Sequence, residues 1–244
     1  MTDRPAMVCA AEIAVAGIRL LADPAGGIFW PGEEALVVAD LHLEKGAAFA
    51  RRGVPLPPYD TPDTLGVIEW LVARYRPRTV IALGDSFHRA DSHQRLPAAI
   101  ARRIARLTAA RRWIWVAGNH DPGPLAGLGG VSADEHTLGP FVLRHEPRPG
   151  LGEAEIAGHL HPVAKVRIRG RVLRRRCFAA GPDRVVMPAL GAYAGGLNVL
   201  DPAFAFIFPH GRFHAWMLGA RRVYPMAPAR LVADQATPAV RRAG

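Results

Sequence analysis

Short apolar runs alternate with amphipathic segments through the first half of the chain. The runs 35–39, 79–83 and 113–117 are almost entirely apolar, which predicts strands buried on both faces of a sheet. Between these runs, apolar residues recur every three to four positions in 61–77 and in 94–110, which predicts two helices. This strand–helix order indicates a sheet that contains parallel strands and carries helices on its faces.

Strand-like runs dominate the second half. The predicted strands are 141–144, 155–157, 165–173, 185–187, 204–208 and 213–218. Near the start of the chain, an alternating run at 12–30 with a turn at 24–27 predicts a hairpin. We therefore expect an α/β (α+β) fold in which two sheets form a β-sandwich flanked by helices. One domain would span residues 1–224, and the Ala/Pro/Arg-rich residues 225–244 would form a flexible C-terminal tail.

Composition narrows the class of protein. Half of the 244 residues are apolar, and the formal net charge of +10 favours a polyanionic partner, with nucleic acid ahead of an anionic membrane. A GC-rich genome would also produce an excess of arginine and alanine, so charge favours nucleic acid only slightly. The two cysteines, Cys9 and Cys177, exclude a disulfide framework and fit a reducing cytoplasm. No apolar run approaches the ~18 residues of a membrane span, so we expect a cytoplasmic protein without a membrane partner.

Five segments rich in metal-binding side chains follow the predicted strands. They are Asp40-Leu-His42, Gly84-Asp85-Ser-Phe-His88, Gly118-Asn119-His120-Asp121, His145 and Gly158-His159-Leu-His161. In sheets with parallel strands, functional sites gather beyond the carboxyl ends of the strands. Carboxylate, imidazole and amide donors suit manganese, iron or zinc, so the pattern predicts a metal site at this edge of the fold.

A centre of two divalent ions about 3.5–4 Å apart suits the hydrolysis of phosphate esters, because it clamps the attacking and leaving oxygens. Two ions that close need an anionic bridge, and Asp85 at the end of a rigid strand is the candidate. A hydroxide shared by both ions would then attack phosphorus in line. His120 is placed to protonate the leaving oxygen as general acid, and Asp121 would hold its ring in the right tautomer.

The order of these motifs resembles the calcineurin-like metallophosphoesterase superfamily. The resemblance implies that superfamily's fold and an enzyme with two divalent ions, most often manganese, with iron or zinc as alternatives. It also implies two ligand sets on either side of Asp85. The first metal would be held by Asp40, His42 and His161, and the second by Asn119, His145 and His159.

The second motif departs from the common G-D-x-x-D pattern, because His88 stands where aspartate is usual. The form G-D-x-F-H resembles the double-strand-break repair nucleases of the superfamily, in which this histidine faces the substrate phosphate. A hydrogen bond from His88 to a metal ligand is the alternative. Protein Ser/Thr phosphatase activity is not expected, because GDSFHRA and GNHD differ from the motifs of those enzymes.

Two basic stretches are candidates for substrate binding. Arg51 and Arg52 follow the first motif, where they would contact a substrate phosphate or remain solvated. In the predicted strand 165–173, Lys165, Arg167 and Arg169 would share one face. That face would follow a phosphate backbone beside the metal centre, although an ordinary solvated strand face explains it equally well.

Three further segments narrow the resemblance to the bacterial ligase-associated DNA damage response endonuclease group (PdeM type). They are Arg176-Cys-Phe-Ala-Ala-Gly181, Val186-Met-Pro-Ala-Leu-Gly191 and Gly195-Gly-Leu-Asn-Val-Leu-Asp201. The resemblance implies a manganese-preferring phosphodiesterase or endonuclease that acts on DNA in repair, as a monomer or dimer, in association with an ATP-dependent DNA ligase and a helicase. Two alternatives stay open: a phosphodiesterase or pyrophosphatase for a small nucleotide or lipid-linked substrate, and a non-catalytic scaffold.

Overall fold

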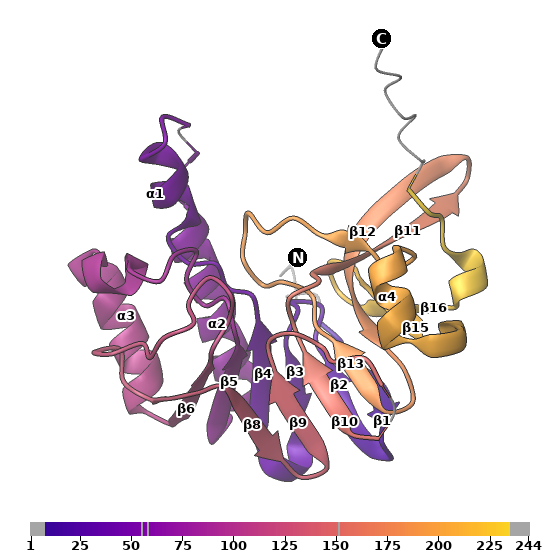
Figure 1. Cartoon of the computed structure of the whole chain (residues 1–244), viewed down its shortest axis with the longest axis horizontal. Coiled ribbons are helices and arrows are strands. Elements are labelled where there is room, and N and C mark those ends of the chain that lie inside the picture. Colours follow the sequence, from indigo (N-terminus) through magenta and orange to yellow (C-terminus); the bar gives the residue numbers. More distant parts are fainter. Residues whose placement is uncertain (1–7, 55, 58, 151, 235–244) are drawn as a thin grey trace, which may run out of the picture.

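Two β-sheets pack face to face in the computed structural model of the chain, which describes residues 8–54, 56–57, 59–150 and 152–234 (Figure 1). Strands of the first sheet follow one another in sequence order. They are β1 (Ala11–Val15), β2 (Ile18–Ala22), β3 (Ile28–Trp30), β4 (Ala35–Ala39), β5 (Thr79–Leu83), β6 (Arg112–Val116) and β7 (Val131–Ala133). The strands β4 to β7 are parallel, as the strand–helix alternation predicts, so the carboxyl ends of β4, β5 and β6 meet at one edge.

The second sheet is mixed. Its strands are β8 (Glu135–Leu138), β9 (Phe141–Arg144), β10 (Ala154–Ala157), β11 (Pro162–Ile168), β12 (Arg171–Ala180), β13 (Arg184–Val186), β14 (Leu197–Asn198), β15 (His214–Leu218) and β16 (Val223–Met226). They are ordered β14-β11-β12-β13-β10-β9-β8, with β15 paired to β12 and β16 paired to β15. The parallel pair β9 and β10 also directs two carboxyl ends to a common edge.

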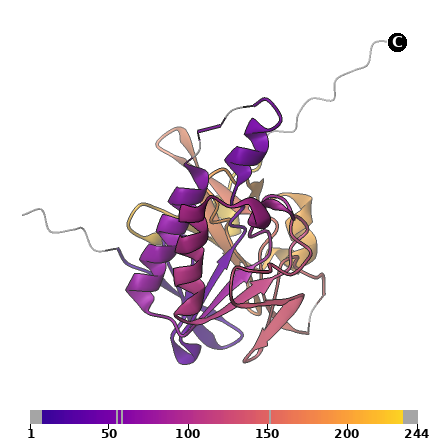
Figure 2. The same cartoon turned by 90° about the vertical axis from the view of Figure 1, so that its left-hand side faces the viewer.

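Helices cover both outer faces of the sandwich (Figures 1 and 2). The helices are α1 (Lys45–Ala50), α2 (Asp60–Tyr75), α3 (Ala98–Ala109) and α4 (Pro202–Ile207). One face of β4, with Leu36 and Val38, packs on α2 and α3, whereas Val37 faces the second sheet. A third apolar cluster places α4 on the outer face of the second sheet. The expected sandwich with flanking helices is confirmed, and none of the described helices has the length and apolar character needed to cross a membrane.

Tight turns divide two segments that we predicted as simpler elements. The N-terminal run contains three strands, because Ala16 and Gly17, with φ of 50° and 75°, reverse the chain between β1 and β2. The predicted strand 165–173 is likewise two strands, β11 and β12, joined at Arg169 and Gly170, with φ of 48° and 77°. Left-handed φ at both turn residues matches the type I′ hairpin, whose twist suits antiparallel strands.

The predicted strand 204–208 is wrong, because most of this segment belongs to α4. Asp201 caps the helix, since its carboxylate accepts a hydrogen bond of 2.9 Å from the backbone nitrogen of Ala203. Pro202 stands at the first helical position, where its missing N–H costs nothing. The alternating phenylalanines suggested a strand, but the Asp-Pro cap signal at the preceding residues indicates a helix.

The predicted helix 94–110 and the predicted flexible tail 225–244 both differ in the structure. The predicted helix 94–110 begins after Pro97, because residues before it form a separate 3₁₀ turn, Ser92–Arg95. The prediction of a loose tail is wrong for residues 225–234: β16 continues to Met226, and Leu231 bridges to Val166 of β11. Residues 235–244 lie outside the described part of the chain.

Candidate metal centre and active site

All seven predicted metal ligands lie at the strand ends that the fold brings to one edge. Asp40, Asp85 and Asn119 follow β4, β5 and β6, whose last residues Ala39, Leu83 and Val116 are in register. The second sheet contributes three histidines: His145 follows β9, His159 follows β10 and His161 directly precedes β11.

The backbone at these positions is unusual. Five of the ligand residues have a left-handed φ between 45° and 69°: Asp40, His42, Asp85, His159 and His161. Asp tolerates this conformation better than most residues, but it still costs about 1–3 kcal/mol when the surroundings impose it. Sharp turns of this kind let two ligands on one segment, such as Asp40 and His42, converge on one point. Strain of this kind concentrates at functional sites.

The first ligand set is compact. The Nε2 atoms of His42 and His161 are 3.2 Å apart, and His161 Nε2 lies 3.3 Å from Asp40 Oδ1. Donors that bind one ion at about 2.0–2.2 Å sit about 3 Å from each other, so this spacing suits a shared ion. The side chains of Asp40 and His42 are buried, which directs their donor atoms to each other rather than to water.

The second set shows the same spacing. Asn119 Oδ1 is 3.0 Å from His145 Nε2 and 3.1 Å from His159 Nδ1, and the two histidine nitrogens are 3.1 Å apart. His145 Nδ1 donates to the carbonyl oxygen of Leu83 at 3.2 Å, which leaves Nε2 with a lone pair for a metal ion. Asp85 lies between the sets, with Oδ1 3.5 Å from His145 Nε2 and Oδ2 4.0 Å from His42 Nε2. These donors fit two divalent ions with Asp85 between them.

At three glycines, the absence of a side chain lets the ligand residues pack against the backbone. A Cβ on Gly118 would lie 2.1 Å from the backbone nitrogen of Asp85 and 2.3 Å from its Oδ1. A Cβ on Gly158 would lie 2.7 Å from Asp40 Oδ2, and one on Gly84 would overlap the His145 ring at 2.4 Å. Each of these glycines leaves space that a ligand side chain occupies. Glycine stands in three of the five motifs of the sequence, but only the packing shows which ligand fills the space beside each one.

His120 lies beside Asp85 with its ring partly open to solvent. Its Nδ1 donates to the carbonyl oxygen of His88 at 3.0 Å, and its Nε2 is 3.9 Å from Asp85 Oδ2. The rings of His88 and His120 stack with centroids 5.0 Å apart. Because Nδ1 is held by a carbonyl, Nε2 is the nitrogen of the His120 ring that is left available for a bound group.

Asp121 does not orient His120, so that prediction is wrong. Its side chain is buried, and Oδ2 accepts a hydrogen bond of 3.0 Å from the backbone nitrogen of Phe87. The carbonyl of His88 orients the His120 ring instead. Burial, assisted by the neighbouring carboxylate of Asp85, raises the pKa of Asp121 to about 7.

Lys45, which belongs to none of the five motifs, lies near His42 and His88. Lys45, the first residue of α1, is half-buried and lowers the pKa of both His42 and His88 through its charge, after the larger effect of burial. Burial also lowers the pKa of Lys45 itself. The only sign of this role in the sequence was that Lys45 stands three residues after His42 of the first motif.

An ion network around the buried pair Arg144 and Glu155 supports the end of β9. Arg144 Nη1 donates to Glu155 Oε1 at 2.9 Å, and Nη2 lies 3.3 Å from carboxylate oxygens of Glu135 and Glu153. Because His145 is the next residue, this network holds the strand end from which a metal ligand projects. Beside it, a hollow of about 710 Å³ is bordered by Asn119, His145 and Arg148, among others.

The predicted substrate cations lie farther out. Arg51 and Arg52 are exposed at the end of α1, and the charge of Arg52 contributes to the low pKa of His88. Lys165 is paired with Asp234 at 2.5 Å, whereas Arg167 and Arg169 are exposed. None of these residues belongs to the metal-ligand cluster of the described chain. Arg169 lies in the turn and not on the strand face predicted for it.

The comparison with protein families decides the assignment. The sequence model of the calcineurin-like phosphoesterase family matches residues 35–173. The chain belongs to this family. It is therefore a metal-dependent phosphoesterase of a family that uses a dinuclear metal centre, and the donor cluster described above could hold metal ions.

One solved structure agrees with the family assignment. The phosphoesterase is similar to the Pseudomonas putida nuclease MPE, with 29% identity, a TM-score of 0.69, and coverage of 89% of this chain and 100% of that one. It also matches YfcE, a phosphoesterase from E. coli, at 15% identity with a TM-score of 0.38, over 79% of this chain and 98% of that one. No curated protein sequence matches significantly. The resemblance seen in the motifs is thus confirmed for the superfamily and for its nuclease type.

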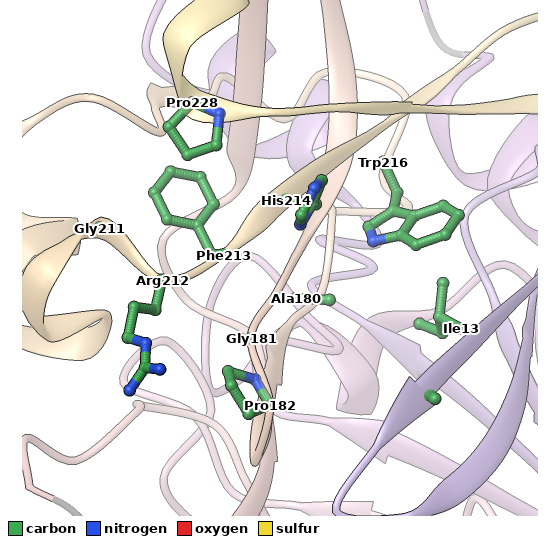
Figure 3. A pocket seen from close by; sticks show the side chains of 11 residues that line it. Ile13, Ala180, Gly181, Pro182, Gly211, Arg212, Phe213, His214, Trp216 and Pro228 are labelled. Carbon is green, nitrogen blue, oxygen red and sulfur yellow. The ribbon is translucent and has the colours of Figure 1, made fainter.

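A second hollow of this phosphoesterase lies away from the metal-ligand cluster. Figure 3 shows it between β1, the end of β12 and β15, where Ile13, Phe213 and Trp216 surround a volume of about 430 Å³. None of the predicted site residues is among the described residues that line it. This hollow and the predicted metal-ligand cluster are therefore separate features of the described chain.

The stability of the metal-free phosphoesterase is expected to fall as the pH drops below about 6.5. Burial lowers the pKa of His42 to about 2 and that of His88 to about 4, so the folded state keeps both rings neutral. An unfolded histidine binds a proton near pH 6.5, so the unfolded state is favoured progressively below that pH. Thermal unfolding of the EDTA-treated protein between pH 5 and 8 measures this dependence.

The variant His42→Gln is the control for that experiment. It removes one of the neutral buried rings, so its melting temperature should depend less steeply on pH between 5 and 6.5. Asp121 acts in the opposite sense, because its raised pKa costs stability as the pH rises toward 7. Identical slopes for the two proteins would show that His42 does not couple folding to pH.

Proposed function

We propose that this phosphoesterase cleaves phosphodiester bonds in DNA as an endonuclease and that it processes DNA ends during repair. The main support is the histidine pair His88 and His120 beside a two-metal donor set, together with similarity to a nuclease over 89% of the chain. A diester leaves an alkoxide that needs a proton, and a ring beside the scissile bond supplies it.

In this proposal, one group of side chains would hold the metal ions and another would transfer a proton. Asp40, His42 and His161 would hold one ion, Asn119, His145 and His159 the other, with Asp85 shared. When bound, such ions activate water at neutral pH and neutralise charge on the phosphoryl oxygens. His120, protonated, would give the Nε2 proton to the leaving oxygen while the His88 carbonyl holds its Nδ1–H. His88 and Lys45 would face the substrate phosphate.

Hydrolysis measured metal by metal tests this function. We expect cleavage of both end-labelled DNA and a bis-aryl phosphodiester, strongest with Mn²⁺, lost with EDTA and restored by added metal. The variant Asp85→Asn should lose at least one bound ion, read by isothermal titration, because it removes the shared charge between the two sets. Full Mn²⁺ binding by Asp85→Asn would contradict the bridging role.

Two other functions make different predictions. Cleavage of the aryl ester with intact DNA would point to a small nucleotide or lipid-linked substrate, for a phosphodiesterase or pyrophosphatase. DNA or protein binding without hydrolysis under any metal would support a scaffold. The nuclease proposal includes a cytoplasmic location, a monomer or dimer, and association with an ATP-dependent DNA ligase and a helicase, which co-purification and size-exclusion chromatography would test.

A further inference from the structure

The hairpin of β11 and β12 extends well beyond the body of the second sheet (Figure 1). Its inner half is built into the core, since Ala164 and Cys177 are fully buried. Its outer half is exposed, and Ile168 and Val172 near the tip each keep 49% of their surface accessible. A two-stranded ribbon alone is only marginally stable, so the buried half anchors the exposed half.

Positive charge at the tip is not compensated. Arg167, Arg169 and Arg171 are exposed, and none of them forms an ion pair with any residue in the described ranges. Closer to the body the cations have polar partners: Lys165 forms an ion pair with Asp234, and Arg174 donates a hydrogen bond to the uncharged carbonyl oxygen of Gly196 at 2.7 Å. The free guanidinium groups are thus concentrated at the end of the hairpin.

One face of the hairpin is turned toward the metal-ligand loops. Residues opposite each other in an antiparallel pair share a face, so Arg167 lies on the face of Arg174 and Arg176. Arg176 donates to the carbonyl oxygen of Ala189 at 2.7 Å, on a loop whose Gly191 nitrogen donates to the Asp40 carbonyl. The face with Arg167 is therefore the one that contacts the loop joined to the Asp40 backbone, whereas Arg171, which is paired with Ile168, lies on the opposite face of the hairpin.

The tip of the hairpin lies far from the metal-ligand cluster, but β11 connects the two directly. His161 immediately precedes β11, and Ile168 is the seventh residue after it, a span of about 23 Å at 3.3 Å per residue. That length corresponds to about seven stacked nucleotides at 3.4 Å each. Helix α1, with Arg51 and Arg52, projects on the other side of the site in the same general direction (Figures 1 and 2).

We propose that the hairpin tip, with Arg167, Arg169 and Arg171, is a phosphate-binding arm for a nucleic acid strand several nucleotides from the bond that is cut. Guanidinium groups recognise phosphate oxygens through paired hydrogen bonds, and aliphatic side chains beside them suit contact with sugars and bases. This inference rests on the proposed nuclease function and adds to it. It implies that the substrate is a polynucleotide, because a mononucleotide bound at the metal-ligand cluster is too short to reach the hairpin tip as well.

Binding of labelled single-stranded DNA to the full chain in EDTA tests the arm. The triple variant Arg167→Gln/Arg169→Gln/Arg171→Gln should bind a 24-mer roughly tenfold more weakly, and its slope of log Kd against log salt should fall by about 2 for three lost phosphate contacts. Binding of a 4-mer should not change. Hydrolysis of the bis-aryl phosphodiester should equal that of wild type, which shows that the active site is intact.

A matched control separates the arm from net charge. Arg102, Arg106 and Arg112 are exposed on α3 and the start of β6, so their replacement by glutamine removes the same charge elsewhere. Equal weakening by both triple variants would overturn the proposal, since only total charge would then matter. Competition by poly-glutamate as strong as that by DNA would also overturn it, in favour of an acidic protein segment.

Failure of the arm and failure of the nuclease function give different results. If wild type does not cut DNA at all, the nuclease function fails, whereas a length-dependent loss of DNA binding in the hairpin variant would still support the arm. If wild type cuts the 24-mer and the hairpin variant has the same kcat/KM and the same Kd, the arm is overturned and the nuclease function stands.

Discussion

Replacing His120 by asparagine is expected to lower kcat for DNA by about 10²–10⁴-fold, the usual contribution of a general acid. The Nε2 atom of His120 points at the site, 3.9 Å from Asp85 Oδ2, and its Nδ1–H is held by the His88 carbonyl. The loss should be much smaller for the bis-aryl phosphodiester, because an aryl oxide leaves without a proton. Steady-state kinetics on both substrates measure this difference.

Two comparisons sharpen that experiment. His136→Asn changes a histidine of β8 outside the ligand cluster and should behave as wild type. Asp121→Asn should retain most activity, because an amide oxygen can still accept from the Phe87 backbone and the His120 ring is held by a different group. Equal losses on both substrates, with less bound metal in His120→Asn, would show that His120 is a ligand and not an acid.

Gly118→Ala is expected to abolish catalysis almost completely, with more than about a 10²-fold loss of kcat/KM on every substrate. Its new methyl group would sit 2.1 Å from the Asp85 nitrogen and 2.3 Å from Oδ1, so Asp85 must move. A displacement of about 1 Å at a reacting centre alone can cost about 10²-fold. Because Asp85 lies between both ligand sets, the variant should also bind fewer Mn²⁺ ions, which titration calorimetry would count.

The chain supplies a matched control for that substitution. A methyl group on Gly123, a few residues farther on, would have no described heavy atom within 4 Å outside the neighbouring residues, so Gly123→Ala should keep activity and metal binding. Circular dichroism of both variants would show whether Gly118→Ala is folded. A folded Gly118→Ala protein with normal Mn²⁺ binding and activity would mean that the crowding at Asp85 is easily relieved.

Much of this fold follows from local pattern. The runs 35–39 and 79–83 are strands as predicted, because short continuous apolar runs are typical of strands that are covered on both faces. Turns were harder to predict. The hairpin at Arg169 and Gly170 falls within a run in which charged and apolar residues alternate from Lys165 to Arg169, so the glycine was the one local signal for the reversal that the pairing of β11 with β12 shows. The helix α4 was missed because alternating phenylalanines outweighed its cap.

The sequence by itself determined which side chains reach the metal centre, because each ligand follows or precedes a strand whose end is set by its apolar pattern. Only the tertiary structure decided which hydrogen-bond partners orient the histidine rings. The partner of His120 is a carbonyl 32 residues away in the chain and not the adjacent Asp121, and the free nitrogen of His145 depends on the Leu83 carbonyl. Such contacts join segments remote in sequence, and their geometry depends on how two sheets pack, which no local pattern encodes.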